Sequence, residues 1–219
     1  MRLPADDETA ATTVRRTRRA GRGKPEILDA AAEVIAARGA DATRFADVSE
    51  ASGVPVGTLQ YYFGNRDDLL HAAFRHIAGQ EIEAMEDVLR VDADPWDQLR
   101  RLLVAVIPEG DHAEGVWRTW VEYWRAGIRD EELREGANAM YRQWHSLVEQ
   151  VLRAGIASGR LRNDIDPGTA AIQIAALVDG IAVPIVLGDE TVSRARNPSR
   201  IVIDAVERLL DVTSGPTAG

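Results

Sequence analysis

One stretch constrains this chain more than any other: residues 43–70, which read TRFADVSEASGVPVGTLQYYFGNRDDLL. Two short helical patterns flank Gly53, and their apolar residues recur at spacings of three, four and seven. The residues expected to face inward by this spacing are Phe45, Val48, Ala51, Val54, Leu59, Tyr62 and Phe63. Polar and small side chains occupy the other face. This layout predicts a helix-turn-helix unit that presents one helix to DNA.

Local signals mark the ends of these two helices. Thr43 is placed to cap the first helix, and Gly53 is suited to the left-handed conformation that ends it. Pro55 suits the start of the next helix, because its missing N–H has no intrahelical partner to lose there. We therefore expect a tight turn between the two helices.

The segment resembles the N-terminal signature of the tetracycline-repressor (TetR) family of bacterial regulators. The matching residues are Thr43, Asp47, Val48, Ala51, Gly53, Val54, Gly57, Thr58, Leu59, Tyr62, Phe63, Asn65, Arg66 and Leu69. Pro55 stands where the family often has serine, and Gln60 stands where tyrosine is common. Both departures bear on how the operator is read rather than on the fold.

The resemblance implies a set of DNA contacts. They are Thr43, Arg44, Pro55, Val56, Gly57, Thr58, Gln60, Tyr61, Tyr62 and Arg66. Arg66 opens the next helix and is expected to hold a phosphate. Gln60 and Tyr61 are expected to read bases, whereas Leu59 and Phe63 are expected in the core.

Net charge has to be divided along the chain before it is interpreted. The 219 residues carry a net charge of −9, which is unusual for a protein that binds DNA. Residues 9–76 hold ten basic and eight acidic side chains, whereas residues 77–219 hold fifteen and twenty-four. The acidity thus belongs to the C-terminal part.

Residues 1–23 form a separate segment in this interpretation. Six basic residues fall within 15–24, which predicts a disordered basic arm that follows DNA phosphates or enters a minor groove. A solvated tail without function is the alternative. Deletion of residues 1–22 should lower DNA affinity and its salt dependence if the arm binds DNA.

The rest of the chain predicts helices throughout. The first should run from Pro25 to Arg38, with Ile27, Leu28, Ala31, Val34 and Ile35 inward. A long helix should follow from Arg66 to about Arg90. Further helices are expected near 95–107, 113–128, 131–158, 167–187 and 199–211. The fold class is therefore all-α: a helix-turn-helix domain at 24–70, a helical effector-binding and dimerisation domain at 71–213, and a flexible tail at 214–219.

Beyond the head, residues 117–124, 159–161 and 177–180 are similar to the TetR subgroup that contains the choline-responsive repressor. This partial likeness supports the architecture, and we take no effector from it. The helix over 169–187 is apolar almost all round, and the last helix offers an apolar stripe. We expect these two helices to pair with those of a second copy in a four-helix bundle.

Aromatic residues of the C-terminal part suggest a pocket for a flat or cationic ligand. Asp179 is the carboxylate expected to meet a cation, although a hydrogen bond at an interface would also satisfy it. The candidate ligand contacts are Phe74, Met85, Trp117, Trp120, Trp124, Tyr141, Trp144, His145 and Asp179. For each aromatic side chain, ordinary core packing is the alternative interpretation.

The sequence favours a ligand-responsive regulator over two other classes. No nucleophile elbow, phosphate loop or zinc-ligand spacing appears, and the chain has no cysteine, which argues against an enzyme or a metal site. No apolar run of about eighteen residues or signal-like start is apparent, so we expect a cytoplasmic protein without a membrane partner. A DNA-binding regulator without a small-molecule effector remains the alternative. We expect no cofactor.

Overall fold

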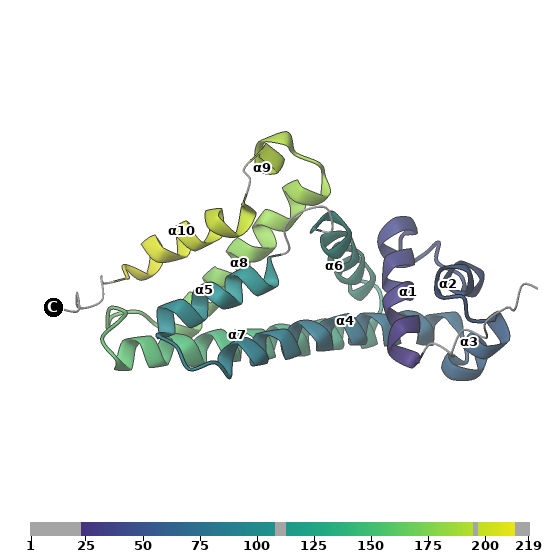
Figure 1. Cartoon of the computed structure of the whole chain (residues 1–219), viewed down its shortest axis with the longest axis horizontal. Helices are drawn as coiled ribbons and strands as arrows, with labels where there is room; N and C mark the ends of the chain where they lie inside the picture. The colour runs from purple at the N-terminus through teal and green to yellow at the C-terminus, as the bar shows by residue number, and fades with distance from the viewer. Residues whose placement is uncertain (1–22, 108–112, 195–196, 213–219) are drawn as a thin grey trace, which may run out of the picture.

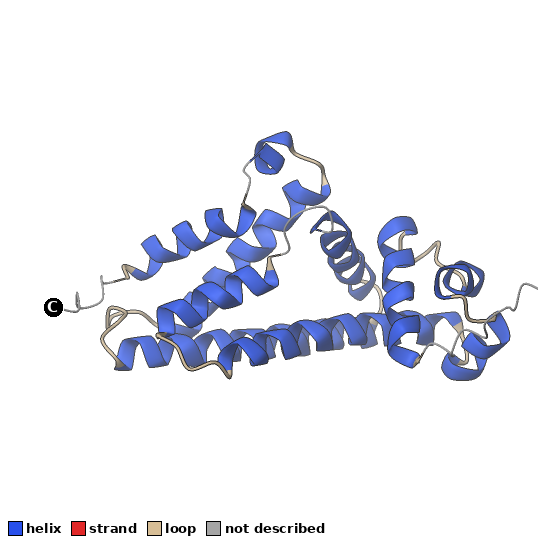
Figure 2. Cartoon of the chain, in the orientation of Figure 1, coloured by secondary structure: helices blue, strands red, loops and turns tan. Residues whose placement is uncertain are grey.

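A computed structural model describes residues 23–107, 113–194 and 197–212. The described residues form helices and connecting loops, and none of them forms a strand (Figures 1 and 2). The helices are α1 (Lys24–Arg38), α2 (Phe45–Ser52), α3 (Val56–Phe63), α4 (Arg66–Leu89), α5 (Pro95–Val106), α6 (Ala113–Gly127), α7 (Glu131–Ala157), α8 (Pro167–Val186), α9 (Glu190–Arg194) and α10 (Pro198–Leu210). The all-α prediction is confirmed. The sequence pattern missed α9, which is too short to show a period.

Helices α1 to α3 form a small head around its own core. The five α1 residues predicted to face inward are all buried, and α3 contributes Leu59 and Phe63. Two predictions of the inward set are wrong: Ala51 is exposed while Ser52 is buried, and Tyr62 is 47% exposed. Ala51 lies in α2 and Tyr62 lies in α3, and each of these two helices has only about two turns. An error of one position in the helical phase therefore changes which residue is buried.

The turn between α2 and α3 follows the predicted geometry with one correction. Gly53 ends α2 in the left-handed region at φ 70°, and α3 begins directly after Pro55. Thr43 is not the cap of α2, because the N-cap residue is Arg44. The backbone N–H of Arg44 donates to the Asp47 carboxylate at 2.9 Å, so Asp47 supports this helix start.

The long helix α4 joins the head to the remaining helices (Figure 1). We call α4 together with α5 to α10 the second layer. It packs on α1 at one end, and it contacts α5 and α7 further along. Helix α7 also packs on α5, α6 and α8, and α10 lies against α5 and α8. The predicted domain boundary at residue 70 therefore falls within a continuous helix. The predicted arm and C-terminal tail lie almost entirely outside the described residues.

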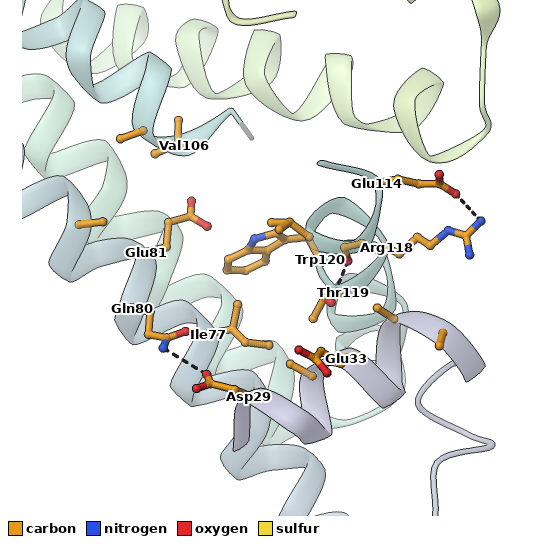
Figure 3. A pocket seen from close by; sticks show the side chains of 17 residues that line it. Asp29, Glu33, Ile77, Gln80, Glu81, Val106, Glu114, Arg118, Thr119 and Trp120 are labelled. Atoms are coloured by element: carbon orange, nitrogen blue, oxygen red, sulfur yellow. Dashed lines mark hydrogen bonds and ion pairs between the residues drawn. The ribbon is translucent and has the colours of Figure 1, made fainter. Parts of the chain in front are cut away.

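A groove of about 800 Å³ lies between α1, α4, α5 and α6, where the head meets the second layer (Figure 3). Its lining includes Ala32, Ala36 and Ala37 of α1, together with Ala84 of α4. Small side chains at these positions leave the space unfilled. The groove therefore has one wall in the head, on α1, and its other walls on α4, α5 and α6.

Helix α8 has an apolar face that the other described residues leave uncovered. The exposed fractions on this face range from 37% to 77%, for Ile172, Leu177 and Val183 of α8 and for Leu187, which follows its last residue. In contrast to the sequence expectation, α8 is long and apolar enough to cross a membrane by length and composition, with mean hydropathy 1.9 in the best window. One third of that window is buried in the fold, and Asp179 lies within the helix.

Candidate functional site

The outward face of α3 carries most of the residues predicted to contact DNA. Gln60 and Tyr61 are exposed, with Tyr61 at 85%, and Tyr62 beside them is 47% exposed. Pro55 and Gly57 are exposed at the start of the helix, whereas Val56 and Thr58 are partly buried. Arg44 is exposed at the start of α2. This face offers aromatic, amide and small side chains without an acidic residue.

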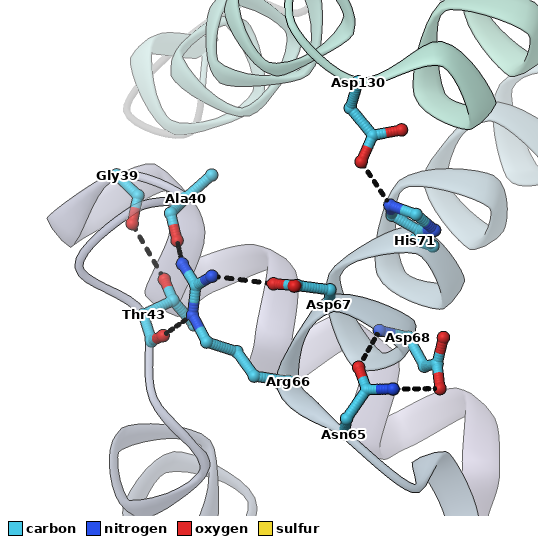
Figure 4. Close-up of polar contacts among 9 residues, drawn as sticks. All are labelled: Gly39, Ala40, Thr43, Asn65, Arg66, Asp67, Asp68, His71 and Asp130. Atoms are coloured by element: carbon cyan, nitrogen blue, oxygen red, sulfur yellow. Dashed lines mark hydrogen bonds and ion pairs between the residues drawn. The ribbon is translucent and has the colours of Figure 1, made fainter.

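Two residues predicted to contact DNA are held inside the head instead (Figure 4). The Thr43 side chain is fully buried, and its hydroxyl donates to the Gly39 carbonyl at 2.9 Å. Arg66 reaches back from α4 and donates from Nε to the Thr43 carbonyl at 2.7 Å and from Nη2 to the Ala40 carbonyl. Its Nη1 pairs with Asp67 at 2.8 Å. Each of the three guanidinium nitrogens thus has a partner within the protein, and the phosphate contact expected of Arg66 stays a prediction.

Polar contacts fasten the head to the second layer. Glu122 of α6 accepts a hydrogen bond from the Ala40 N–H at 2.8 Å. Arg125 bridges Glu122 and Asp41 at 2.9 and 2.7 Å. His71 of α4 lies 2.8 Å from Asp130 (Figure 4). The loop after α1 is therefore tied directly to α6.

The predicted aromatic residues gather around a small closed cavity between α4, α6, α7 and α8. We call this group the aromatic cage; it consists of Glu81, Trp117, Trp120, Trp124, Met140, Tyr141, Trp144, Ala175, Val178 and Asp179. Its volume is about 20 Å³, room for a single water molecule. Six of the nine predicted ligand contacts belong to this cage.

Three predicted contacts lie elsewhere. Phe74 is fully buried and stacks on Tyr123 with ring centroids 4.6 Å apart, and Met85 is fully buried in the core. His145 lies outside the lining, with its ring 6.0 Å from Tyr141 and 5.9 Å from Trp144. The sequence analysis missed Glu81, although its spacing of seven from Phe74 and four from Met85 placed it on the same face of α4.

Two carboxyl groups from different helices face the cage. The Tyr141 hydroxyl donates to Asp179 at 2.7 Å, and burial raises the pKa of Asp179. Burial and the neighbouring Asp179 together raise the pKa of Glu81 to about 7. In the described part of the chain, Glu81 has no ion pair with a basic side chain. A carboxylate in this setting is stabilised by any cation that enters.

The indole N–H of Trp117 is a polar group of the cage residues that has no hydrogen-bond partner among the described residues. Trp117 is 3% exposed, and its Nε1 is buried without a hydrogen-bond partner among the described residues. A buried donor without an acceptor is unfavourable. The cage therefore combines aromatic faces and acidic groups, which attract cations, with an N–H that would donate a hydrogen bond to a ligand oxygen.

The comparisons with known proteins agree with this arrangement. Residues 27–73 match the tetR family of bacterial regulatory proteins, and residues 95–211 match the C-terminal domain of BetI-type transcriptional repressors. The chain is 28% identical over 160 residues to the regulator BetI of Burkholderia ambifaria, covering 72% of this chain and 79% of that protein. It is also 28% identical over 167 residues to the fatty acid metabolism regulator protein of Bacillus subtilis, covering 75% and 84%.

A solved structure of a transcriptional regulator from Saccharomonospora viridis in complex with choline superimposes with a TM-score of 0.76. It is 25% identical to this chain and covers 86% of this chain and 97% of its own. Fold, head and C-terminal match together define a helix-turn-helix transcriptional regulator rather than an enzyme. The chain belongs to the tetR family of bacterial regulatory proteins, with a C-terminal domain of the BetI type.

Proposed function

We propose that this protein is a homodimeric repressor that binds a pseudo-palindromic operator and leaves it when an organic cation enters the aromatic cage. The head would place α3 in the major groove. Gln60, Tyr61 and Tyr62 are the proposed base and backbone contacts from α3. Arg44 approaches from the start of α2, and Pro55, Val56, Gly57 and Thr58 allow the backbone to come close to DNA.

The uncovered apolar face of α8 supports the dimer. Ile172 and Val183 are 58% and 51% exposed, and Ile201 of α10 is 43% exposed. A second copy that lays its own α8 and α10 on this surface would bury the face and give two-fold symmetry. Such a pairing, rather than a lipid bilayer, is the proposed cover of α8, and it is compatible with a cytoplasmic protein. A monomer in sedimentation at micromolar concentration would overturn this proposal.

The single observation that carries the effector class is the pair of carboxyl groups, Glu81 and Asp179, inside a ring of aromatic side chains. Quaternary ammonium ions are recognised by such rings, because the aromatic faces and the carboxylates both attract positive charge. The structural relative from Saccharomonospora viridis was solved with choline, which belongs to this class. Choline is therefore the first probe.

Ligand binding and operator binding would oppose each other, because the two heads of the dimer would take one position when DNA is bound and another when the ligand is bound. Helix α4 carries Glu81 in the cage and Arg66 at the loop of the head, so a shift of α4 reaches both sites. The bond from Glu122 to the Ala40 N–H gives α6 a second link to the same loop. A ligand that favours one position of these helices weakens DNA binding by the same factor by which DNA weakens ligand binding.

A regulator without a small-molecule effector is the second candidate. The observation that favours it is the small volume of the cage, about 20 Å³, which is close to a filled interior. In that case a protein partner would control the heads, or repression would be constitutive. Choline would then change neither the thermal midpoint nor the affinity for DNA.

The test is binding of the purified protein to a labelled duplex from the region upstream of its own gene. A scrambled duplex is the control, and salt and choline are titrated. Selective binding that choline weakens supports the whole proposal. Selective binding that choline leaves unchanged, with no thermal shift, favours the second candidate.

A further inference from the structure

The groove between the head and the second layer has the properties of a ligand site. Its volume of about 800 Å³ falls in the range of small-molecule pockets. Alanine side chains from three helices and Ile77, Val106 and Val116 give it an apolar lining. An apolar hollow of this size would favour the burial of a hydrocarbon group.

The charge of the groove is acidic. Asp29, Glu33, Glu81 and Glu114 line it, and its basic side chain Arg118 is paired with Glu114 (Figure 3). Asp29 accepts from His76 at 2.8 Å and from Gln80 at 3.3 Å, whereas Glu33 has no ion pair among the described residues. This imbalance disfavours an anionic ligand such as a fatty acid and favours a cationic one.

The groove and the aromatic cage share a wall. Glu81 of α4 and Trp120 of α6 line both hollows, and Figure 3 shows their side chains extending toward each other from the two helices. The cage on the far side holds about 20 Å³, too little for a quaternary ammonium group. A rotation of Trp120 away from Glu81 would join the two spaces into one.

We propose that the groove is a second subsite, in which the apolar arm of an amphiphilic organic cation lies while its cationic head occupies the aromatic cage. The inference rests on the proposed effector class and extends it from compact cations to cations that carry an alkyl or aromatic arm. The arm contacts α1 of the head as well as α4 and α6. The bound ligand thus spans the joint that sets the position of the head, and the arm itself contributes to release from DNA.

Two probes that differ in the arm alone test this inference. Tetramethylammonium carries the cationic head alone, and octyltrimethylammonium adds a chain for the groove. We expect octyltrimethylammonium to bind the full-length protein at least about tenfold more tightly in titration calorimetry, because its methylenes leave water. Octanoate, which carries a similar chain and the opposite charge, should bind more weakly than octyltrimethylammonium.

Groove-filling variants identify where the chain lies. Ala84→Phe on α4 and Ala37→Phe on α1 fill the groove from opposite walls, and both alanines are exposed, so the core is left intact. Ala139→Phe is the matched control, because Ala139 is exposed on α7 and lines neither hollow. Both groove variants should lose the advantage of the octyl chain and keep tetramethylammonium affinity within about twofold, while the control keeps both.

The outcomes separate this inference from the proposed function. Equal affinity of the wild type for the two cations, or an octyl advantage that survives in both groove variants, overturns the second subsite and leaves the cation cage standing. Tighter binding of octanoate overturns the charge assignment of the groove. Failure of both cations to bind overturns the cage and this inference together.

Discussion

The head and the effector domain place their polar side chains in different roles. In the head, Asp47, Asn65 and Arg66 hydrogen-bond to backbone groups at helix ends and in the loop after α1. In the effector domain, Glu81 lines the aromatic cage, and the Trp117 N–H has no hydrogen-bond partner among the described residues. Polar groups of the first kind hold the fold, whereas groups of the second kind are available to a ligand. Substitutions should therefore separate stability from ligand response.

The largest effect is expected in the head. Arg66→Ala leaves the Thr43 and Ala40 carbonyls without their donor, and the free energy of unfolding should fall by about 2 kcal/mol. Urea denaturation measures this change. Arg44→Ala is the matched control, because Arg44 is exposed beside the proposed DNA surface. It should leave stability unchanged and weaken DNA binding, and an equally stable Arg66→Ala protein would remove the contrast.

The next effect is expected in the cage. Glu81→Gln keeps the shape of the side chain and removes its charge, so choline affinity should fall by about tenfold, or 1.4 kcal/mol. The free energy of unfolding should not fall, because the substitution removes a buried charge that has no basic partner, and such a charge is unfavourable. Glu83→Gln on the exposed side of α4 is the control for calorimetry. Choline binding that survives in Glu81→Gln would place the recognition of charge elsewhere.

A related effect depends on pH. The pKa of Glu81 is raised to about 7 in the folded protein, so its carboxylate is mostly protonated at pH 6 and mostly ionised at pH 8. A cation prefers the carboxylate, and choline affinity should therefore increase by up to about tenfold across this interval. Without ligand, the raised folded pKa means that stability falls as pH rises from the unfolded value near 4.5 through 7.

The control for this pH dependence is Glu81→Gln, which should bind choline with an affinity that varies much less between pH 6 and pH 8. Asp179, Tyr141 and His145 also face this region from α8 and α7. A pH dependence that persists unchanged in the variant would show that a group other than Glu81 causes it. The measurement is calorimetric titration at three pH values in buffers of equal ionic strength.

The smallest effect is expected at the junction. Glu122→Ala leaves the Ala40 N–H without its acceptor, which should lower the free energy of unfolding by about 1 kcal/mol. It should also reduce the factor by which choline weakens DNA binding, because α6 loses its link to the loop of the head. Asp41→Ala removes the exposed partner of Arg125 and should change neither quantity measurably. Identical behaviour of the two variants would argue against this link.

The sequence predicted the helices well because their signals are local. Gly39 and Gly53 end α1 and α2, and Pro95, Pro167 and Pro198 stand in the first turns of α5, α8 and α10. The buried face of a short helix was harder to predict. In α2, Ala51 was expected to be buried, but Ser52 is buried and Ala51 is exposed. The cap of α2 was misplaced by one residue for a similar reason, since Thr43 and Arg44 both precede the helix and only the backbone path distinguishes them.

The candidate site was predictable in part. Trp117, Trp120 and Trp124 share a face of one helix, so their spacing alone brings them together in the cage. That Glu122 meets Ala40, 82 residues earlier, depends on how α6 packs against the head. Likewise, Glu81 and Asp179 lie on helices far apart in the chain, so no local pattern brings them together. The tertiary fold alone brings the Thr43 and Ala40 carbonyls to Arg66, so these partners could not be predicted from the sequence. Without them, the sequence indicated only a phosphate contact for Arg66.

Recognition of positive charge by the aromatic cage is the property on which the proposed function most depends. Calorimetric titration of the full-length protein with choline, and with its neutral isostere dimethylbutanol in which carbon replaces the nitrogen, tests this claim most directly. The account predicts that choline binds at least about tenfold more tightly than the isostere, and that Glu81→Gln narrows the difference. Equal affinity for the two compounds, or binding of neither, would contradict it.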